Sequence, residues 1–238
     1  MVLDPGGNLA TYRYDALGRR ISKSLNGQTR TRYVYDGDRL IQERDGDSTG
    51  QLVASYVYGL GSDEVLTRRR WQGGVGSDLF YHTNALGSVA AVTSSNGAVV
   101  ERYQYDAYGQ VTFLSPTFTP LTSSAVYNNL LFTGRYYDPE TKLYDYRART
   151  YHPYLGRFLQ RDPLGEAASL NLYNYVFNNP VNDTDPTGRK CASSMATPPW
   201  KIGTPPASGS GSCLTGPTIT RRVRGAAIRK SLGRSRRR

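Results

Sequence analysis

A phrase of alternating tyrosine and polar residues, Tyr-x-Tyr followed by Asp-x-x-Gly, returns along the first half of the chain. Its leading tyrosines are Tyr12, Tyr33, Tyr56, Tyr81 and Tyr103, and the copy at Tyr81 is the weakest. The steps between them are 21, 23, 25 and 22 residues. A nearly constant period of this length predicts a stacked repeat architecture.

Each phrase predicts a strand, a tight turn and a second strand. In a strand, Tyr-x-Tyr places both rings on one face, and tyrosine suits a half-buried pleated surface. The turn follows from Asp or Asn at its first position and Gly at its fourth, as in 15–18, 84–87 and 106–109. One hairpin cannot bury its own face, so neighbouring hairpins must stack. We therefore expect an all-β fold of stacked antiparallel hairpins that form part of a wound repeat sheet.

Three segments of the chain differ in composition. We assign residues 1–131 to the repeats, with a longer loop over 116–131, and residues 132–188 to a denser and more distinctive segment. Within that segment, residues 169–177 predict one short helix that ends before Pro180. Residues 189–238 are rich first in Pro, Ser and Gly and then in Arg, which predicts a disordered basic tail.

Charge separates this tail from the rest of the chain. The 238 residues carry a formal net charge of +11, but residues 189–238 hold 12 Lys and Arg and no Asp or Glu. The body is therefore near neutral, and we expect the tail to contact nucleic acid or anionic surfaces without specificity. No apolar run is long enough for a transmembrane helix, and the first residues do not read as a signal peptide.

The second segment contains an ordered series of motifs that resembles a known family. The series is Gly134-Arg135-Tyr136-Tyr137-Asp138, Arg147-Ala148-Arg149, Gly156-Arg157-Phe158, Arg161-Asp162-Pro163, Asn171-Leu172-Tyr173, Asn178-Asn179-Pro180 and Asp185-Pro186-Thr187-Gly188. It resembles the Rhs-associated core of Rhs (rearrangement hotspot) proteins, and the repeated phrase looks like their YD repeat. The resemblance covers roughly residues 10–188. We expect a C-terminal portion of such a protein, since the chain starts in mid-repeat.

The resemblance implies the shell or carrier part of a polymorphic toxin. In such proteins the repeat sheet winds into a hollow, cocoon-like shell around a variable C-terminal toxin, which acts on neighbouring bacteria or on a host. The implied partners are the remainder of the Rhs shell upstream, a delivery apparatus such as type VI secretion, and an immunity protein. The implied location is secreted or at the cell surface, as part of a longer parent.

Two Asp-Pro-x-Gly tetrads, 162–165 and 185–188, stand 23 residues apart. One interpretation is structural, because these residues are preferred in a type I turn. The other is catalytic, because two carboxyls brought together share a proton and can act as acid and base on a water that attacks a peptide bond. Asp162 and Asp185 would then be the carboxyls, and Arg161 would hold one of them charged or stabilise the oxyanion.

The resemblance favours the catalytic interpretation. Rhs cores of this kind resemble aspartyl autoproteases that cut just after a final Asp-Pro-x-Gly-Leu, which implies a cleavage site at Gly188, Arg189 and Lys190. The enzyme activity that we expect is at most this self-cleavage. Arg189 stands where the family usually has leucine. A subsite for an aliphatic side chain would meet a guanidinium, so we expect impaired or lost cutting.

The tail occupies the position of the toxin but contains no His, Asp or Glu. It is too short and too polar to bury a core unaided, which predicts a truncated or degenerate effector. We expect no cofactor and no metal site, since His82 and His152 are isolated in the sequence. The alternative function is that of a surface-exposed carbohydrate- or cell-binding repeat protein, in which an aromatic residue such as Trp71 stacks on sugar.

Overall fold

The computed structural model describes residues 2–3, 6–61, 63–165 and 170–189. Its largest element is a 12-stranded antiparallel sheet in which the strands follow one another in chain order. The strands are β1 (Val2–Leu3), β2 (Leu9–Tyr14), β3 (Arg20–Leu25), β4 (Gln28–Asp36), β5 (Arg39–Asp45), β6 (Leu52–Tyr58), β7 (Val65–Gln72), β8 (Val75–Thr83), β9 (Val89–Ser94), β10 (Val99–Tyr105), β11 (Val111–Leu114) and β12 (Pro120–Leu121). This order confirms the all-β fold of stacked hairpins.

The predicted turns join successive strands of this sheet. Gly18, Gly87 and Gly109 each donate a backbone N–H to the carbonyl oxygen three residues earlier, at 3.0, 2.9 and 3.1 Å. The aspartate also fixes the turn, since Asp106 Oδ1 accepts the backbone N–H of Tyr108 at 2.9 Å. The Asp-x-x-Gly motif therefore sets where one strand ends and the next begins.

The leading tyrosines of the phrases lie on the buried face of the large sheet. Tyr33, Tyr56, Tyr81 and Tyr103 are buried, and a second tyrosine such as Tyr58 is partly buried against the same hydrophobic core. In the phrases at Tyr33, Tyr56 and Tyr103 both rings thus lie on one face, as the strand period predicts, whereas in the first phrase Tyr12 is half-buried and Tyr14 is exposed. Burial of these large rings supplies much of the apolar area that the sheet removes from water.

Two buried charged side chains fix the loop that follows the large sheet. Glu101 of β10 accepts the backbone N–H of Ala125 at 2.6 Å. Arg68 of β7 donates to the carbonyl oxygens of Val126 and Tyr127, both at 2.6 Å. Because these charges are removed from water, their hydrogen bonds must replace hydration, and they hold the loop against the sheet.

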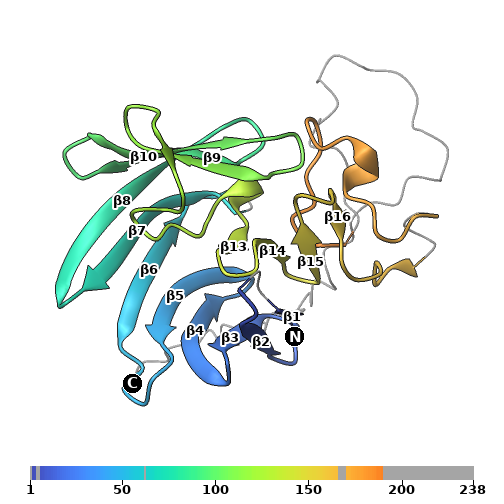
Figure 1. The fold of residues 1–238 in the computed structure, drawn as a ribbon, viewed down its shortest axis with the longest axis horizontal. Coiled ribbons are helices and arrows are strands. Elements are labelled where there is room, and N and C mark those ends of the chain that lie inside the picture. Colours follow the sequence, from blue (N-terminus) through green and yellow to red (C-terminus); the bar gives the residue numbers. More distant parts are fainter. Residues whose placement is uncertain (1, 4–5, 62, 166–169, 190–238) are drawn as a thin grey trace, which may run out of the picture.

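A smaller sheet follows a short 3-10 turn, η1 (Phe132–Gly134). Its four antiparallel strands are β13 (Tyr136–Asp138), β14 (Leu143–Tyr146), β15 (Arg149–His152) and β16 (Arg157–Phe158). The large sheet curves around β13 and β14, which lie on its concave side (Figure 1). Arg20 of β3 joins the two sheets through buried ion pairs with Asp138 and Asp145, both at 2.7 Å.

The structure differs from the helix predicted over 169–177. Residues 170–175 are bends and turns with one isolated bridge, and only a 3-10 turn, η3 (Val176–Asn178), follows them. The reason is that the carbonyls of this segment bond to other parts of the chain. Tyr173 O accepts the N–H of Phe158 and Leu172 O accepts that of Asp162, both at 2.9 Å. A carbonyl used in this way is not available for a helical bond.

The tail predicted over 189–238 lies outside the described residues, with the exception of Arg189. Within the part of the chain that the structure does describe, no helix is long and apolar enough to cross a membrane. The described molecule is therefore two sheets around one tyrosine-rich core, and the segment 159–189 follows the last strand of the smaller sheet.

Candidate active site

The two Asp-Pro-x-Gly tetrads form similar turns at the end of the described chain. Gly165 donates its backbone N–H to the carbonyl of Asp162 at 3.0 Å, and Gly188 donates to that of Asp185 at 3.4 Å. In each turn the aspartate side chain accepts the backbone N–H of the residue two positions on, at 2.9 and 3.3 Å. Both tetrads are therefore turns, as their residue preferences predict.

The carboxylates of these two turns meet at one arginine. Asp162 Oδ2 and Asp185 Oδ2 each lie 3.1 Å from the Nη2 atom of Arg149. The three side chains are almost wholly removed from solvent, with exposed fractions of 3%, 1% and 1%. A turn of this type forms equally well with its carboxylate in water. The burial of both carboxylates at Arg149 is therefore not explained by turn formation alone.

Arg149 is held in place by the strand that carries it and by its neighbours. It begins β15, and its guanidinium carbon lies 3.6 Å from the centre of the Phe158 ring of β16. Its Nη1 donates to the carbonyl of Leu172 at 3.2 Å, and its Nε donates to that of Gly188 at 2.5 Å. All the nitrogens of the guanidinium are engaged, which fixes its orientation.

Burial sets the ionisation of this cluster. It raises the pKa of the Asp185 carboxyl to about 6, because the charged form loses its hydration, while Arg149 opposes that shift. Burial also lowers the pKa of Arg149, and the two carboxylates oppose this change. Asp185 therefore holds a proton at mildly acid pH while it remains hydrogen-bonded to Arg149.

The predicted cleavage segment lies directly on the cluster. Gly188 is buried, Arg189 is exposed, and Lys190 lies outside the described residues. Asp185 Oδ1 accepts the backbone N–H of Arg189 at 3.1 Å, and the hydroxyl of Thr187 donates to the carbonyl of Arg189 at 3.0 Å. The two carbonyls at 188 and 189 thus each accept a hydrogen bond.

Arg161 does not join the cluster in this structure. Its side chain is exposed, although the next residue, Asp162, is buried. The guanidinium between the carboxylates belongs instead to Arg149, for which the sequence predicts no role. A signal for it exists: Arg149 and Tyr151 stand two apart on a strand, so a buried Tyr151 predicts that Arg149 faces the same side.

Asp183, which also lies between the tetrads, is outside the cluster. It is buried and accepts a hydrogen bond from the side chain of Asn179 at 3.0 Å. Among the residues that the structure describes, no group of three or more His, Cys, Asp and Glu is placed to hold a metal ion. The chemistry of the cluster is therefore built from two carboxyls and one guanidinium.

The repeat sheet and the buried carboxylate pair define a repeat-shell protein, and comparison with known proteins gives its family. A sequence model of the Teneurin YD-shell family matches residues 2–181. The tRNA3(Ser)-specific nuclease WapA of Bacillus spizizenii is 40% identical over 183 residues, which cover 75% of this chain and 7% of that protein. The double-stranded DNA deaminase toxin A of Burkholderia cenocepacia is 33% identical over 218 residues, 82% of this chain and 14% of that protein.

Solved structures agree with the sequence comparisons. The crystal structure of TcdB2-TccC3-TEV matches with a TM-score of 0.60 and 26% identity, over 76% of this chain and 9% of that one. A Tc holotoxin pore structure from Photorhabdus luminescens matches with a TM-score of 0.57 and 25% identity, over 77% and 9%. The chain spans only a small share of the length of each relative. It belongs to the YD-shell family and is a shell part of the Rhs type found in polymorphic toxins.

Proposed function

We propose that this chain is the closing part of a toxin shell and that it cuts its own backbone within residues 188–190. The observation that supports self-cleavage is the convergence of Asp162 and Asp185 on one nitrogen of Arg149. Burying two carboxylates and a guanidinium is costly. The turns themselves would form as well with both carboxylates in water, so their burial together favours a catalytic role.

The cluster contains the groups that peptide hydrolysis needs. A base takes a proton from water, a cation or donor stabilises the oxyanion, and an acid protonates the leaving amine. Asp162 is suited to act as the base, Arg149 to stabilise the oxyanion, and Asp185, with its pKa raised to about 6, to act as the acid. The water oxygen bonds to the carbonyl carbon, the C–N bond breaks, and the new amine takes the proton.

The contacts of the cleavage segment support this assignment. The carbonyl of Gly188 accepts from Arg149 and the carbonyl of Arg189 accepts from Thr187, so both C=O bonds are polarised. Arg189 is exposed in the described structure, so its guanidinium does not lie in an apolar subsite. This exposure argues for cutting even though Arg189 stands where the family that the chain resembles usually has leucine.

The intact mass of the full chain tests the proposal. We expect wild-type protein to yield two fragments whose masses place the cut within 188–190, and the Asp162→Asn variant to stay whole. The matched control is Asp183→Asn, which alters another buried aspartate outside the cluster and should leave cutting unchanged. Wild type that stays at full length, as the Asp162→Asn variant does, would overturn self-cleavage.

The larger context of the chain is also part of the proposal. We place it in a longer, secreted or surface-associated protein, with the remainder of the shell upstream, and with a delivery apparatus and an immunity protein as partners. We also propose that the basic tail, residues 189–238, contacts nucleic acid without specificity. Relatives whose names describe toxins and nucleases support this context, and they do not favour a carbohydrate- or cell-binding repeat protein.

A further inference from the structure

Arg147 occupies a junction between the large sheet and the second Asp-Pro-x-Gly turn. It directly follows β14 and has a positive φ of 60°, which is unusual for a residue with a side chain. Its backbone N–H is bound by Asp145 Oδ1 at 2.8 Å, which stabilises this conformation. The conformation sends the guanidinium away from the strand and toward the tips of two hairpins of the large sheet.

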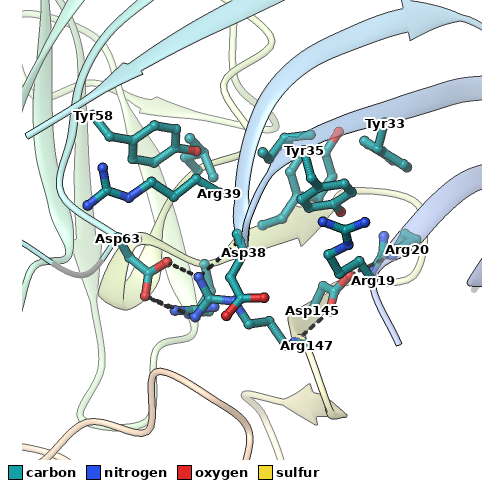
Figure 2. Close-up of a pocket in the computed structure, with 15 residues that line it drawn as sticks. Arg19, Arg20, Tyr33, Tyr35, Asp38, Arg39, Tyr58, Asp63, Asp145 and Arg147 are labelled. Atoms are coloured by element: carbon teal, nitrogen blue, oxygen red, sulfur yellow. Dashed lines mark hydrogen bonds and ion pairs between the residues drawn. The ribbon is translucent and has the colours of Figure 1, made fainter. Parts of the chain in front are cut away.

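At those hairpins the guanidinium binds a carboxylate and a carbonyl. Nη2 of Arg147 lies 2.7 Å from Asp63 Oδ1 and donates to the carbonyl of Asp38 at 3.1 Å. Nη1 lies 3.4 Å from the other oxygen of Asp63, which also pairs with Arg135. Figure 2 shows Asp63 and Arg147 facing each other across one side of a pocket. The large sheet thus supplies the acceptors that fix Arg147.

The same guanidinium also reaches the cleavage turn. Nη1 of Arg147 donates to the carbonyl of Pro186, inside the second tetrad. Its neighbour Ala148 donates a backbone N–H to the carbonyl of Thr187 at 3.4 Å. Arg149, two residues further on, binds Asp185 and the carbonyl of Gly188. The turn is therefore held along one edge by three successive residues.

We propose that Arg147 is a positioning residue that, anchored by Asp63 of the large sheet, holds the 185–188 turn in register with Arg149. This inference rests on the self-cleavage proposed above. It makes cutting dependent on an assembled repeat sheet, because Asp63 and Asp38 belong to the loops that join its strands. Displacement of a reacting group by about 1 Å is enough to slow a reaction by about 100-fold.

A double-mutant cycle on cleavage tests the coupling. We expect Asp63→Asn and Arg147→Lys each to slow cutting by roughly 10- to 100-fold. The two effects should be clearly less than additive, because both variants break the Asp63–Arg147 link, although Asp63→Asn also removes the pair with Arg135. The matched control is Asp78→Asn, which breaks an exposed ion pair with Arg69 on the same sheet and should change nothing. Additive effects, or an unchanged rate in Asp63→Asn, would overturn the inference.

The pH dependence of cutting separates positioning from general destabilisation. Arg149 and Arg135 favour the charged form of Asp185, Asp162 lies beside it, and burial accounts for its raised pKa. If the turn loosens, Asp185 gains water, and the midpoint of the pH profile should fall from about 6 toward 4 in Asp63→Asn. A merely less stable protein would keep the wild-type midpoint.

Amide exchange keeps the two proposals distinguishable. If the wild-type chain does not cut itself, the proposal of self-cleavage is refuted. The positioning role of Arg147 is then tested separately, by the hydrogen-exchange rates of the Ala148 and Arg189 amides. Both amides are hydrogen-bonded to the turn. Faster exchange of both in Asp63→Asn, with unchanged exchange in the β9–β10 hairpin, would support a positioning role. Unchanged exchange at Ala148 and Arg189 would refute it.

Discussion

Asp162 and Asp185 lie 23 residues apart in the chain, yet each places a carboxylate oxygen 3.1 Å from the same Arg149 nitrogen. Two tight turns of identical pattern present these carboxylates from separate segments. Because Arg149 pairs with both carboxylates, its positive charge offsets part of the cost of removing Asp162 and Asp185 from water. This sharing also makes Arg149 the residue on which the cluster depends most.

We predict that Arg149→Lys abolishes or strongly slows self-cleavage. A lysine ammonium is a point charge on a flexible stem, and it cannot hold two carboxylates and two carbonyls in the planar arrangement that Arg149 holds. Loss of one electrostatic stabiliser typically costs about 100- to 1000-fold in rate. The measurement is the fraction of full-length chain over time, resolved by mass spectrometry.

Arg157→Lys is the matched control for that change. Arg157 lies over the ring of Tyr173, in the turn segment beside β16, 5.0 Å from its centre, and it is exposed. Its replacement removes a guanidinium near the cluster without touching either aspartate. Equal rates for wild type and Arg149→Lys would show that the shared guanidinium has no catalytic part.

We predict that cutting slows as pH rises above about 6. Burial raises the pKa of Asp185 to about 6, so the protonated form, which the proposed mechanism uses as the acid, is lost above that value. Below it the group keeps its proton, and the rate should reach a plateau. Above it the rate should fall roughly tenfold per pH unit. A rate that instead rises through pH 6–8 would assign Asp185 the role of base.

We predict that Arg189→Leu changes the rate of cutting by less than about threefold, a change of less than about 1 kcal/mol in the barrier. The resemblance to relatives predicts a large gain from leucine. The structure leaves Arg189 exposed, so its side chain does not occupy an apolar subsite that leucine would fill better. Quenched samples taken over time and weighed by mass spectrometry give the ratio of the two rates. A gain of tenfold or more would favour the subsite explanation.

We predict that Gly188→Ala destabilises the chain and stops cutting. Gly188 has a φ of 64°, and a Cβ there would lie 2.0 Å from the carbonyl oxygen of Tyr146. The turn could not keep its place against β14. The expected loss is several kcal/mol of unfolding free energy, which chemical denaturation measures.

The first tetrad supplies the control for this prediction. Gly165 has the same φ of 64°, but a Cβ there would meet nothing within 4 Å among the described atoms. Gly165→Ala should therefore cost only the backbone strain of about 1–2 kcal/mol. Similar losses at both positions would show that the contact with Tyr146 is relieved by a shift of the turn.

The repeat sheet follows closely from the sequence because its determinants are local. Tyr-x-Tyr fixes the face that a strand buries, and Asp-x-x-Gly fixes its end, so 15–18 and 106–109 form turns as predicted. The helix predicted over 169–177 fails for a non-local reason. The carbonyls of Leu172 and Tyr173 bond to residues before them in the chain, which no window of sequence reveals.

The candidate site is also predicted in part. The tetrads mark Asp162 and Asp185 because the pattern of a turn is short and specific. Arg161 is adjacent to Asp162 in the sequence, but its side chain is exposed, and the buried partner of Asp162 is Arg149. Nothing in the sequence predicts the ion pair between Asp63 and Arg147. Asp63 lies in the loop after β6 and resembles any other loop aspartate, and only the folded structure brings it to Arg147.

The order of strands in the large sheet has a consequence for the time at which the site forms. Each strand pairs with its neighbour in the chain, so hairpins can form in turn as the polypeptide leaves the ribosome. The ion pair between Arg20 and Asp138 spans 118 residues and must wait for the second sheet. Asp185 is synthesised later still. Synthesis from the N-terminus therefore orders assembly: the large sheet of this chain can form before Asp162 and Asp185 are made and can meet at Arg149.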